Sequence, residues 1–229
     1  MSGRVVKPIS DSYEKQRQFI TNAGHDLKTP ITVIDADTEL AELELGQCEW
    51  LDDIRKQTRR LARLTGDLIY LSRMDEQPLL ERAEIDFSAL ICEEADSFSA
   101  VAVSRQKDVV TKIAEGVSVF GNATELRKLV DLLIDNAVKY STEEVIGVTL
   151  ERVGKHARLA VTNAAEGMTD EVASRMFDRF YRGDGARSSH GGFGIGLSIA
   201  SAIVAAHKGR IAAATSGGML TITVMLPIQ

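Results

Sequence analysis

Apolar residues in the first third of the chain recur every three or four positions, the spacing of a helix with one apolar face. The pattern covers residues 12–45, is interrupted at Gly46-Gln47 and resumes over residues 49–75, so it predicts a helical hairpin. The second helix carries a coiled-coil-like seam of Leu51, Ile54, Thr58, Leu61, Leu64, Leu68 and Leu71. Two helices bury such a seam poorly, and we therefore infer a homodimer in which a second copy completes a four-helix bundle.

Beyond Gln77-Pro78 the pattern changes to short alternating runs, and we place a domain boundary there. We expect a lead-in over residues 1–11, a helical domain over 12–77 and a second domain over 78–229. The runs predict strands at Ala83–Phe87, Asp108–Ile113, Val117–Phe120, Val145–Leu150, Arg158–Thr162 and Leu220–Leu226. Helical patterns separate them at Ser88–Gln106, Ala123–Tyr140, Thr169–Phe180 and Ile195–His207. Returning strands favour an antiparallel or mixed sheet with helices on one face, a two-layer α+β sandwich.

The charge balance is acidic, with 33 Asp and Glu against 27 Lys and Arg, which argues against nonspecific binding of nucleic acid. Cys48 and Cys92 have no second ligand at metal spacing, so neither a zinc site nor a disulfide framework is expected. The longest mostly apolar segment, Ile195–Ala206, is shorter than the roughly 18 residues that a membrane helix needs. Because no charged and then apolar leader opens the chain, we expect a cytoplasmic protein without a membrane segment.

A histidine stands beside an acid in the first helical stretch. His25 precedes Asp26, and Thr29 lies four residues after His25 on the same helical face. Pro30 offers no N–H to the carbonyl of Asp26, which predicts a kink beside the histidine. Taken alone, these residues suit a solvated surface pair as well as they suit a reaction centre.

Three clusters in the second domain suit a bound nucleotide. Near the end of the helix that follows Asn122, an amide, an ammonium and a phenol at Asn136, Lys139 and Tyr140 suit Mg²⁺, a phosphate and a base or ribose, although such residues are also common on surfaces. Small residues over 161–168 let a ligand approach the end of a strand. Glycines at 192, 194 and 196 free the backbone N–H groups at the start of a helix to hold phosphate oxygens. No Lys-Ser or Lys-Thr follows them, so this is not a Walker loop.

In this order and at these separations, the segments closely resemble the sensor histidine kinases of bacterial two-component signalling. The resemblance covers nearly the whole chain from Phe19 onward. The matching segments are the H-box His25–Pro30, the N-box Asn136–Ser141, the first glycine box Val161–Met168, the F-box Phe177–Phe180 and the second glycine box Gly192–Leu197.

The resemblance implies a dimerisation and phosphoacceptor hairpin joined to an ATP-binding domain, with residues 183–191 as a lid. In this family His25 would be the nucleophile towards ATP, Asp26 would orient or deprotonate its ring, and Thr29 would serve a phosphatase reaction. Asn136 would hold Mg²⁺, and the phosphoryl group would pass to an aspartate of a response regulator receiver domain. The chain would be the cytoplasmic part of a membrane-bound sensor. The nucleotide contacts implied are Asn136, Lys139, Tyr140, Asn163, Gly167, Phe180, Arg182, Gly192, Gly194, Gly196 and Leu197.

Two positions depart from the family pattern, and a third differs from related ATPases. Asn163 replaces an aspartate that accepts a hydrogen bond from adenine, which predicts a contact weaker by about 1 kcal/mol. Ala165 replaces a glycine, and alanine costs roughly 1 kcal/mol more if that site needs a positive φ. Leu132 stands where related ATPases carry a water-activating glutamate, which disfavours a hydrolytic ATPase.

Two functions remain open at this level. The first is an ATP-dependent histidine kinase with phosphatase activity. The second is a degenerate kinase that serves as a dimeric scaffold or phosphorelay partner and binds nucleotide weakly, because of Asn163 and Ala165. His207, at the end of a helix before Lys208-Gly209, is interpreted as a positively charged group that favours the helix dipole.

Overall fold

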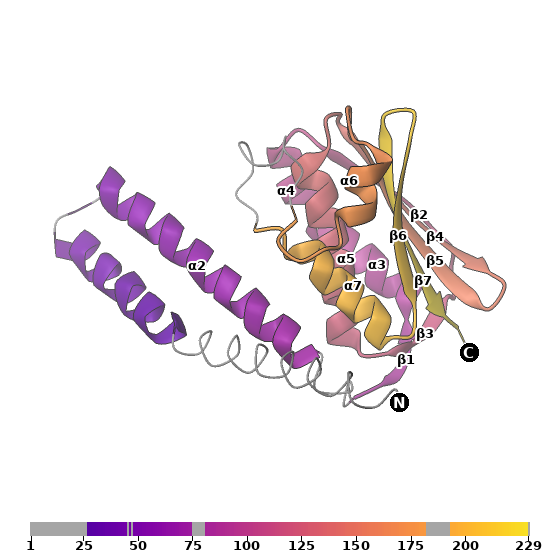
Figure 1. Ribbon diagram of the computed structural model, residues 1–229, viewed down its shortest axis with the longest axis horizontal. Coiled ribbons are helices and arrows are strands. Elements are labelled where there is room, and N and C mark those ends of the chain that lie inside the picture. Colours follow the sequence, from indigo (N-terminus) through magenta and orange to yellow (C-terminus); the bar gives the residue numbers. More distant parts are fainter. Residues whose placement is uncertain (1–26, 45, 47, 75–80, 182–192, 229) are drawn as a thin grey trace, which may run out of the picture. The chain divides into compact units, whose positions relative to one another are not determined.

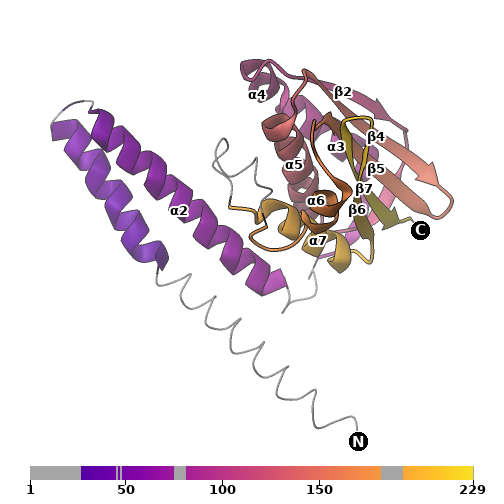
Figure 2. The same ribbon diagram turned by 45° about the horizontal axis from the view of Figure 1, so that its top comes forward.

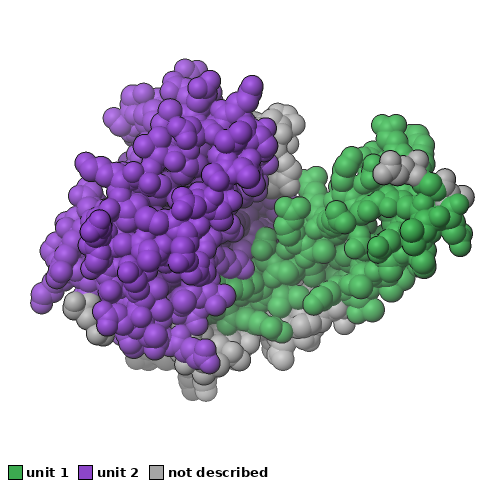
Figure 3. Space-filling view, turned by 180° about the vertical axis from the view of Figure 1, so that it is seen from behind, with its two compact units in different colours: residues 1–76 green, residues 77–229 purple. Residues whose placement is uncertain are grey.

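The computed structural model describes residues 27–44, 46, 48–74, 81–181 and 193–228. The chain divides into two compact units, residues 1–76 and residues 77–229, which Figure 3 distinguishes by colour. Each unit is described by itself. Across the described ranges, no helix is both long enough and apolar enough to cross a membrane.

The first unit contains a helical hairpin, as the apolar periodicity predicts. Residues 27–44 are helical and run beside α2 (Glu49–Met74) (Figure 2), while Gly46 between them has a φ of 79°. Between the helices, Thr38, Thr58 and Thr65 are buried, and each hydroxyl donates to the carbonyl four residues earlier. This intrahelical bond satisfies the hydroxyl in an otherwise apolar contact.

A half-buried ion pair also joins the two helices of the hairpin. The guanidinium of Arg55 contacts the carboxylate of Glu42. Arg55, the first of several basic residues over 55–63, therefore points to the neighbouring helix. Eight large apolar residues of the hairpin are at least 44% exposed within one chain: Leu27, Val33, Ile34, Leu40, Leu43, Trp50, Ile54 and Leu61.

The second unit is built on a five-stranded mixed sheet in the order β2-β4-β5-β7-β6. Its strands are β2 (Asp108–Ile113), β4 (Val145–Val153), β5 (His156–Ala164), β6 (Arg210–Ser216) and β7 (Met219–Pro227). The pair β2 and β4 is parallel, and the other neighbours are antiparallel. Strand β6 is absent from the predicted set, because its alanine-rich sequence has little β-propensity and pairing with β7 supplies its conformation.

Two short strands, β1 (Ala83–Asp86) and β3 (Ser118–Gly121), pair antiparallel in a separate ribbon. The helices α3 (Phe87–Ser97), α4 (Ser99–Ser104), α5 (Ala123–Tyr140), α6 (Asp170–Arg175) and α7 (Gly196–Ala206) lie on one side of the large sheet (Figure 1). The two-layer sandwich is therefore confirmed. The helical spacing of Leu126, Val130, Leu133 and Ala137 puts them on one face of α5, and they are at most 1% exposed.

Two predicted helices are shorter than expected. The helix expected over residues 88–106 breaks at Phe98, where Ser97 and Ser99 on either side donate their hydroxyls to carbonyls three residues earlier. These side-chain bonds compete with the backbone bonds of a continuous helix. The helix expected over 169–180 ends at Arg175, and Phe180 has a φ of 65°, which no right-handed helix accepts.

Candidate active site

The last turns of α5 carry the three polar residues of the N-box. Asn136, Lys139 and Tyr140 are half-buried beside the fully buried Ala137 and Val138. The Asn136 amide has no hydrogen-bond partner within the described ranges, so both of its ends are free for a ligand. The helix itself starts at a side-chain cap, because Oδ1 of Asn122 accepts from the N–H of Glu125 at 3.0 Å.

Acidic groups lie along the same helix. Lys139 forms an ion pair with Asp135, one turn earlier. Burial raises the pKa of Asp131, the neighbouring Asp135 carboxylate raises it further, and Lys139 partly offsets the shift. A phosphate near Lys139 would therefore compete with Asp135 for the ammonium group.

Asn163 lies at the end of β5 and is 1% exposed. Its Nδ2 donates to the carbonyl oxygen of Ala164 at 3.0 Å, which leaves Oδ1 as the free end of the amide. The same carbonyl accepts the N–H of Thr142, just after α5, at 3.0 Å. The N-box and the first glycine box are thereby joined.

The condition for strain at Ala165, a positive φ, is not met in the structure. Among the described non-glycine residues, only Gln106, Phe180 and Lys208 have a positive φ, so Ala165 occupies an ordinary conformation. Its N–H donates to the carbonyl of Gly218 at 2.7 Å. Gly167 does have a φ of 75°, which favours glycine at that position.

The F-box meets the second glycine box through the backbone. The N–H of Phe180 donates to the carbonyl of Gly194 at 3.0 Å, and Gly194 has a φ of 72°. The guanidinium of Arg175 lies 4.5 Å from the centre of the Tyr181 ring, which fixes the segment after α6.

Leu132 contacts the first turn of α7, a feature that motif spacing does not reveal. A Cβ placed on Gly196 would lie 3.5 Å from Cδ2 of Leu132. This contact brings the residue one turn before Asn136 against the second glycine box. An aliphatic group therefore occupies the position beside this helix start, and it cannot activate water.

Some predicted residues cannot be placed. His25, Asp26, Arg182, Gly192 and the lid over 183–191 lie outside the described residues. Thr29 is exposed on the first helix, while Phe180 is 58% exposed and Leu197 is half-buried.

His207 differs from its sequence interpretation. The residue is buried, and burial lowers its pKa, so it is a neutral group rather than a cation at the end of α7. The residues next to His207 in the sequence indicate a charged group, whereas the groups that enclose its ring come from segments that are remote in sequence.

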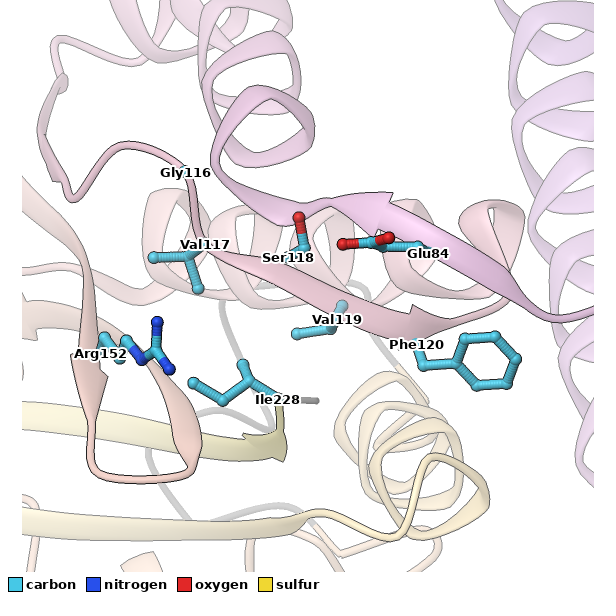
Figure 4. Close-up of a pocket in the computed structure, with 8 residues that line it drawn as sticks. All are labelled: Glu84, Gly116, Val117, Ser118, Val119, Phe120, Arg152 and Ile228. Atoms are coloured by element: carbon cyan, nitrogen blue, oxygen red, sulfur yellow. The ribbon is translucent and has the colours of Figure 1, made fainter.

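A surface pocket elsewhere in the second unit contains none of the predicted site residues. The β1–β3 ribbon, the β4–β5 hairpin and the end of β7 form its walls (Figure 4). The residues that line it are Glu84, Gly116, Val117, Ser118, Val119, Phe120, Arg152 and Ile228.

Comparisons with known proteins agree with this organisation. Residues 15–77 match the His Kinase A (phospho-acceptor) domain model, and residues 121–229 match the model of histidine kinase-, DNA gyrase B- and HSP90-like ATPases. The chain is 32% identical to the sensor protein DltS of Streptococcus agalactiae, over 100% of this chain and 58% of that protein. It is 34% identical to the sensor histidine kinase TrcS of Mycobacterium tuberculosis, over 95% of this chain and 45% of that protein.

Solved structures share the fold. Full-length ShkA, in complex with AMPPNP, superposes with a TM-score of 0.79 at 20% identity, over 92% of this chain and 45% of that one. ThkA, in complex with the response regulator protein TrrA, gives a TM-score of 0.68 at 20% identity, over 99% of this chain and 67% of that one. The chain spans between 45% and 58% of the length of the curated relatives DltS and TrcS. With both domain models matched in order, this chain belongs to the sensor histidine kinases of two-component systems.

Proposed function

We propose that this chain transfers the γ-phosphoryl group of ATP to His25 and then to an aspartate of a response regulator receiver domain. The observation that carries the proposal is the assembly of the separate boxes into one region of the second unit. Thr142 bonds to Ala164, Phe180 bonds to Gly194, and Leu132 contacts Gly196. The family and the nucleotide analogue in the ShkA structure support ATP as the ligand.

In this proposal the nucleotide contacts come from three elements. The free Oδ1 of Asn163 accepts a hydrogen bond from the adenine amino group, because Nδ2 is held by Ala164. The N–H groups at the start of α7 bind phosphate oxygens, with glycine at 194 and 196 permitting the approach. Lys139 shares its charge between Asp135 and a phosphate.

Asn136 is the residue that would hold Mg²⁺. Its half-buried amide is unpartnered within the described ranges, and an amide oxygen is a suitable ligand for a hard cation. Bound Mg²⁺ would neutralise charge on the phosphate oxygens.

His25 and Asp26 carry the proposed chemistry by resemblance to the family. The Nε2 lone pair of His25 forms the new N–P bond, the bond from the γ-phosphorus to the bridging oxygen breaks, and ADP leaves with that electron pair. Asp26 accepts the hydrogen bond from Nδ1–H and stabilises the ring as positive charge develops. A receiver carboxylate then attacks the phosphorus, and the histidine leaves as neutral imidazole.

The first unit supports a homodimer and a second reaction. Its exposed apolar residues give a second copy of the hairpin a surface to cover. Thr29 is exposed, so its hydroxyl is accessible for placing a water in a phosphatase reaction.

We assign residues 12–77 to dimerisation and phosphoacceptance and 78–229 to ATP binding. The resemblance to membrane-bound sensors, together with a match to 58% of the length of the sensor protein DltS, supports a place in the cytoplasmic part of a longer, membrane-bound sensor.

Incubation with ATP labelled at the γ-phosphate tests this function. The expected product is protein-bound label that is stable to base and lost in acid. The label should be absent from the His25→Gln variant and present in a matched His156→Gln variant, which changes an exposed histidine at the first position of β5. Undiminished labelling of His25→Gln would overturn the assignment. No labelling of the unmodified protein, with nucleotide still bound, would favour the scaffold.

A further inference from the structure

His207 joins segments of the second unit that are far apart in sequence. Its Nδ1 lies 2.8 Å from the carbonyl oxygen of Ile203, while its Nε2 accepts the N–H of Asn122 at 3.1 Å. A carbonyl can only accept, and Asn122 donates, so Nδ1 carries the proton and Nε2 presents its lone pair. The two bonds together require the neutral ring.

The ring also packs directly on the backbone of β3. A Cβ placed on Gly121 would come within 2.4 Å of Cδ2 of His207, so glycine alone leaves room for the imidazole. The next residue, Asn122, both caps α5 and donates through Nδ2 to the carbonyl of Glu81 at 3.0 Å. Arg82 donates to the carbonyl of Ala206 at 2.8 Å. The start of α5, the end of α7 and the segment before β1 therefore meet around one imidazole.

This junction lies at the opposite ends of the two helices from the candidate active site. Residue Asn136 is near the end of α5, whereas α7 begins at Gly196 and ends at Ala206. The inner face of α7 is buried, with Ile199, Ala200 and Ile203 fully enclosed. A packed helix moves as a rigid body, so a shift at His207 displaces the first turn of α7 against Leu132.

The charged groups around the ring oppose a second proton. Burial is the main cause that lowers the pKa of His207, and the positive charge of Arg82 lowers it further, while the bond to Ile203 partly offsets them. Lys208 follows His207 and is exposed. Glu81 and Glu125 contact this junction through their backbones. The carbonyl of Glu81 accepts from Nδ2 of Asn122, and the N–H of Glu125 donates to Oδ1 of Asn122. A protonated ring would point an N–H at the N–H of Asn122, which breaks that contact.

We propose that His207 is a positioning residue of the nucleotide site whose protonation releases the end of α7 from α5 and weakens nucleotide binding. The inference rests on the proposed function only in naming nucleotide as the ligand. Acidification therefore lowers the affinity of this kinase for ATP through a group that never touches the nucleotide.

Binding of AMPPNP at two pH values tests the consequence for the site. The His207→Gln variant places an amide oxygen where Nε2 accepts from Asn122, and it cannot titrate. Between about pH 7.5 and about pH 5.5, the Kd of the unmodified chain is expected to rise at least about threefold more than that of His207→Gln. The matched His156→Gln variant, at the exposed first position of β5, should follow the unmodified chain. An equal pH dependence in all three proteins would overturn the proposal.

A second readout needs no bound nucleotide. The backbone amide signal of Asn122 in the unmodified chain, followed by NMR during an acid titration, should shift together with the signals of the last turn of α7. Arg82→Gln, which removes the positive charge beside the ring, should move the midpoint of that titration to higher pH. An Asn122 signal that is independent of His207 protonation would overturn the proposed junction. Absence of AMPPNP binding at every pH would instead contradict the proposed function.

Discussion

The backbone N–H of Thr142 donates to the carbonyl oxygen of Ala164 at 3.0 Å, and this bond joins the residue that follows the N-box to the middle of the first glycine box. The same oxygen accepts Nδ2 of Asn163. One carbonyl thus orients the amide that replaces the family's aspartate. The substitution removes a charge from the site, but it adds an internal hydrogen bond that an aspartate lacks.

Replacing Asn163 with aspartate should therefore change affinity and stability in opposite directions. The carboxylate strengthens the bond to the adenine amino group, and ATP is expected to bind about fivefold more tightly, the equivalent of about 1 kcal/mol. The same change loses the donor to Ala164 and buries a charge, so the thermal midpoint should fall. Titration calorimetry and thermal unfolding measure the two effects. If both the affinity for ATP and the thermal midpoint rose, the bond from Asn163 to Ala164 would contribute little to stability.

Lys208 lies in the left-handed region at the end of α7, with a φ of 58°. The next residue, Gly209, donates to the carbonyl of Val204 at 2.9 Å, which completes the helix-ending turn. Lys208→Gly removes the steric cost of that conformation and should raise the free energy of unfolding by about 1 kcal/mol. Denaturant unfolding measures the change. The control Lys155→Gly, at an exposed turn position without a positive φ, should not stabilise the protein.

Glu125 has a buried carboxylate oxygen, Oε2, without a hydrogen-bond partner in the described part of the chain. Burial raises the pKa of Glu125 from its usual 4.5, and Lys128 partly offsets the rise. Because the folded pKa lies above the unfolded one, ionisation costs stability as the pH rises through the folded value. Glu125→Gln should therefore raise the thermal midpoint at about pH 7 and lose this advantage below about pH 4.5. A gain that is equal at both pH values would rule out this electrostatic cause.

The exposed apolar residues of the hairpin predict which substitutions should prevent dimerisation. Leu40 and Ile54 are 60% and 44% exposed within one chain. A lysine at either position would bury an unpaired charge in the expected four-helix bundle, so Leu40→Lys and Ile54→Lys should shift the mass measured by light scattering to that of a monomer. Val103→Lys is the matched control, because Val103 is 72% exposed in the second unit. A dimer that persists in both hairpin variants would contradict this interface.

The sequence by itself determined the hairpin, the core face of α5, most strands and the identity of the boxes. These features rest on local rules: helical spacing at three and four residues, alternation in strands, and glycines where the backbone approaches a ligand. The break of a helix at Phe98 was missed, because serines that bond to their own turn leave the apolar spacing intact.

Only the tertiary structure decided the parallel pairing of β2 with β4, the strand conformation of β6, the ordinary φ of Ala165 and the neutral state of His207. The functional roles of the site residues, within and outside the described ranges, stay predictions. Asn122 and His207, which share a hydrogen bond, are 85 positions apart in the chain. The protonation state of such a residue depends on which distant groups enclose it. A local sequence pattern does not identify those groups, because burial and the electrostatic potential at the side chain arise only when the segments pack together.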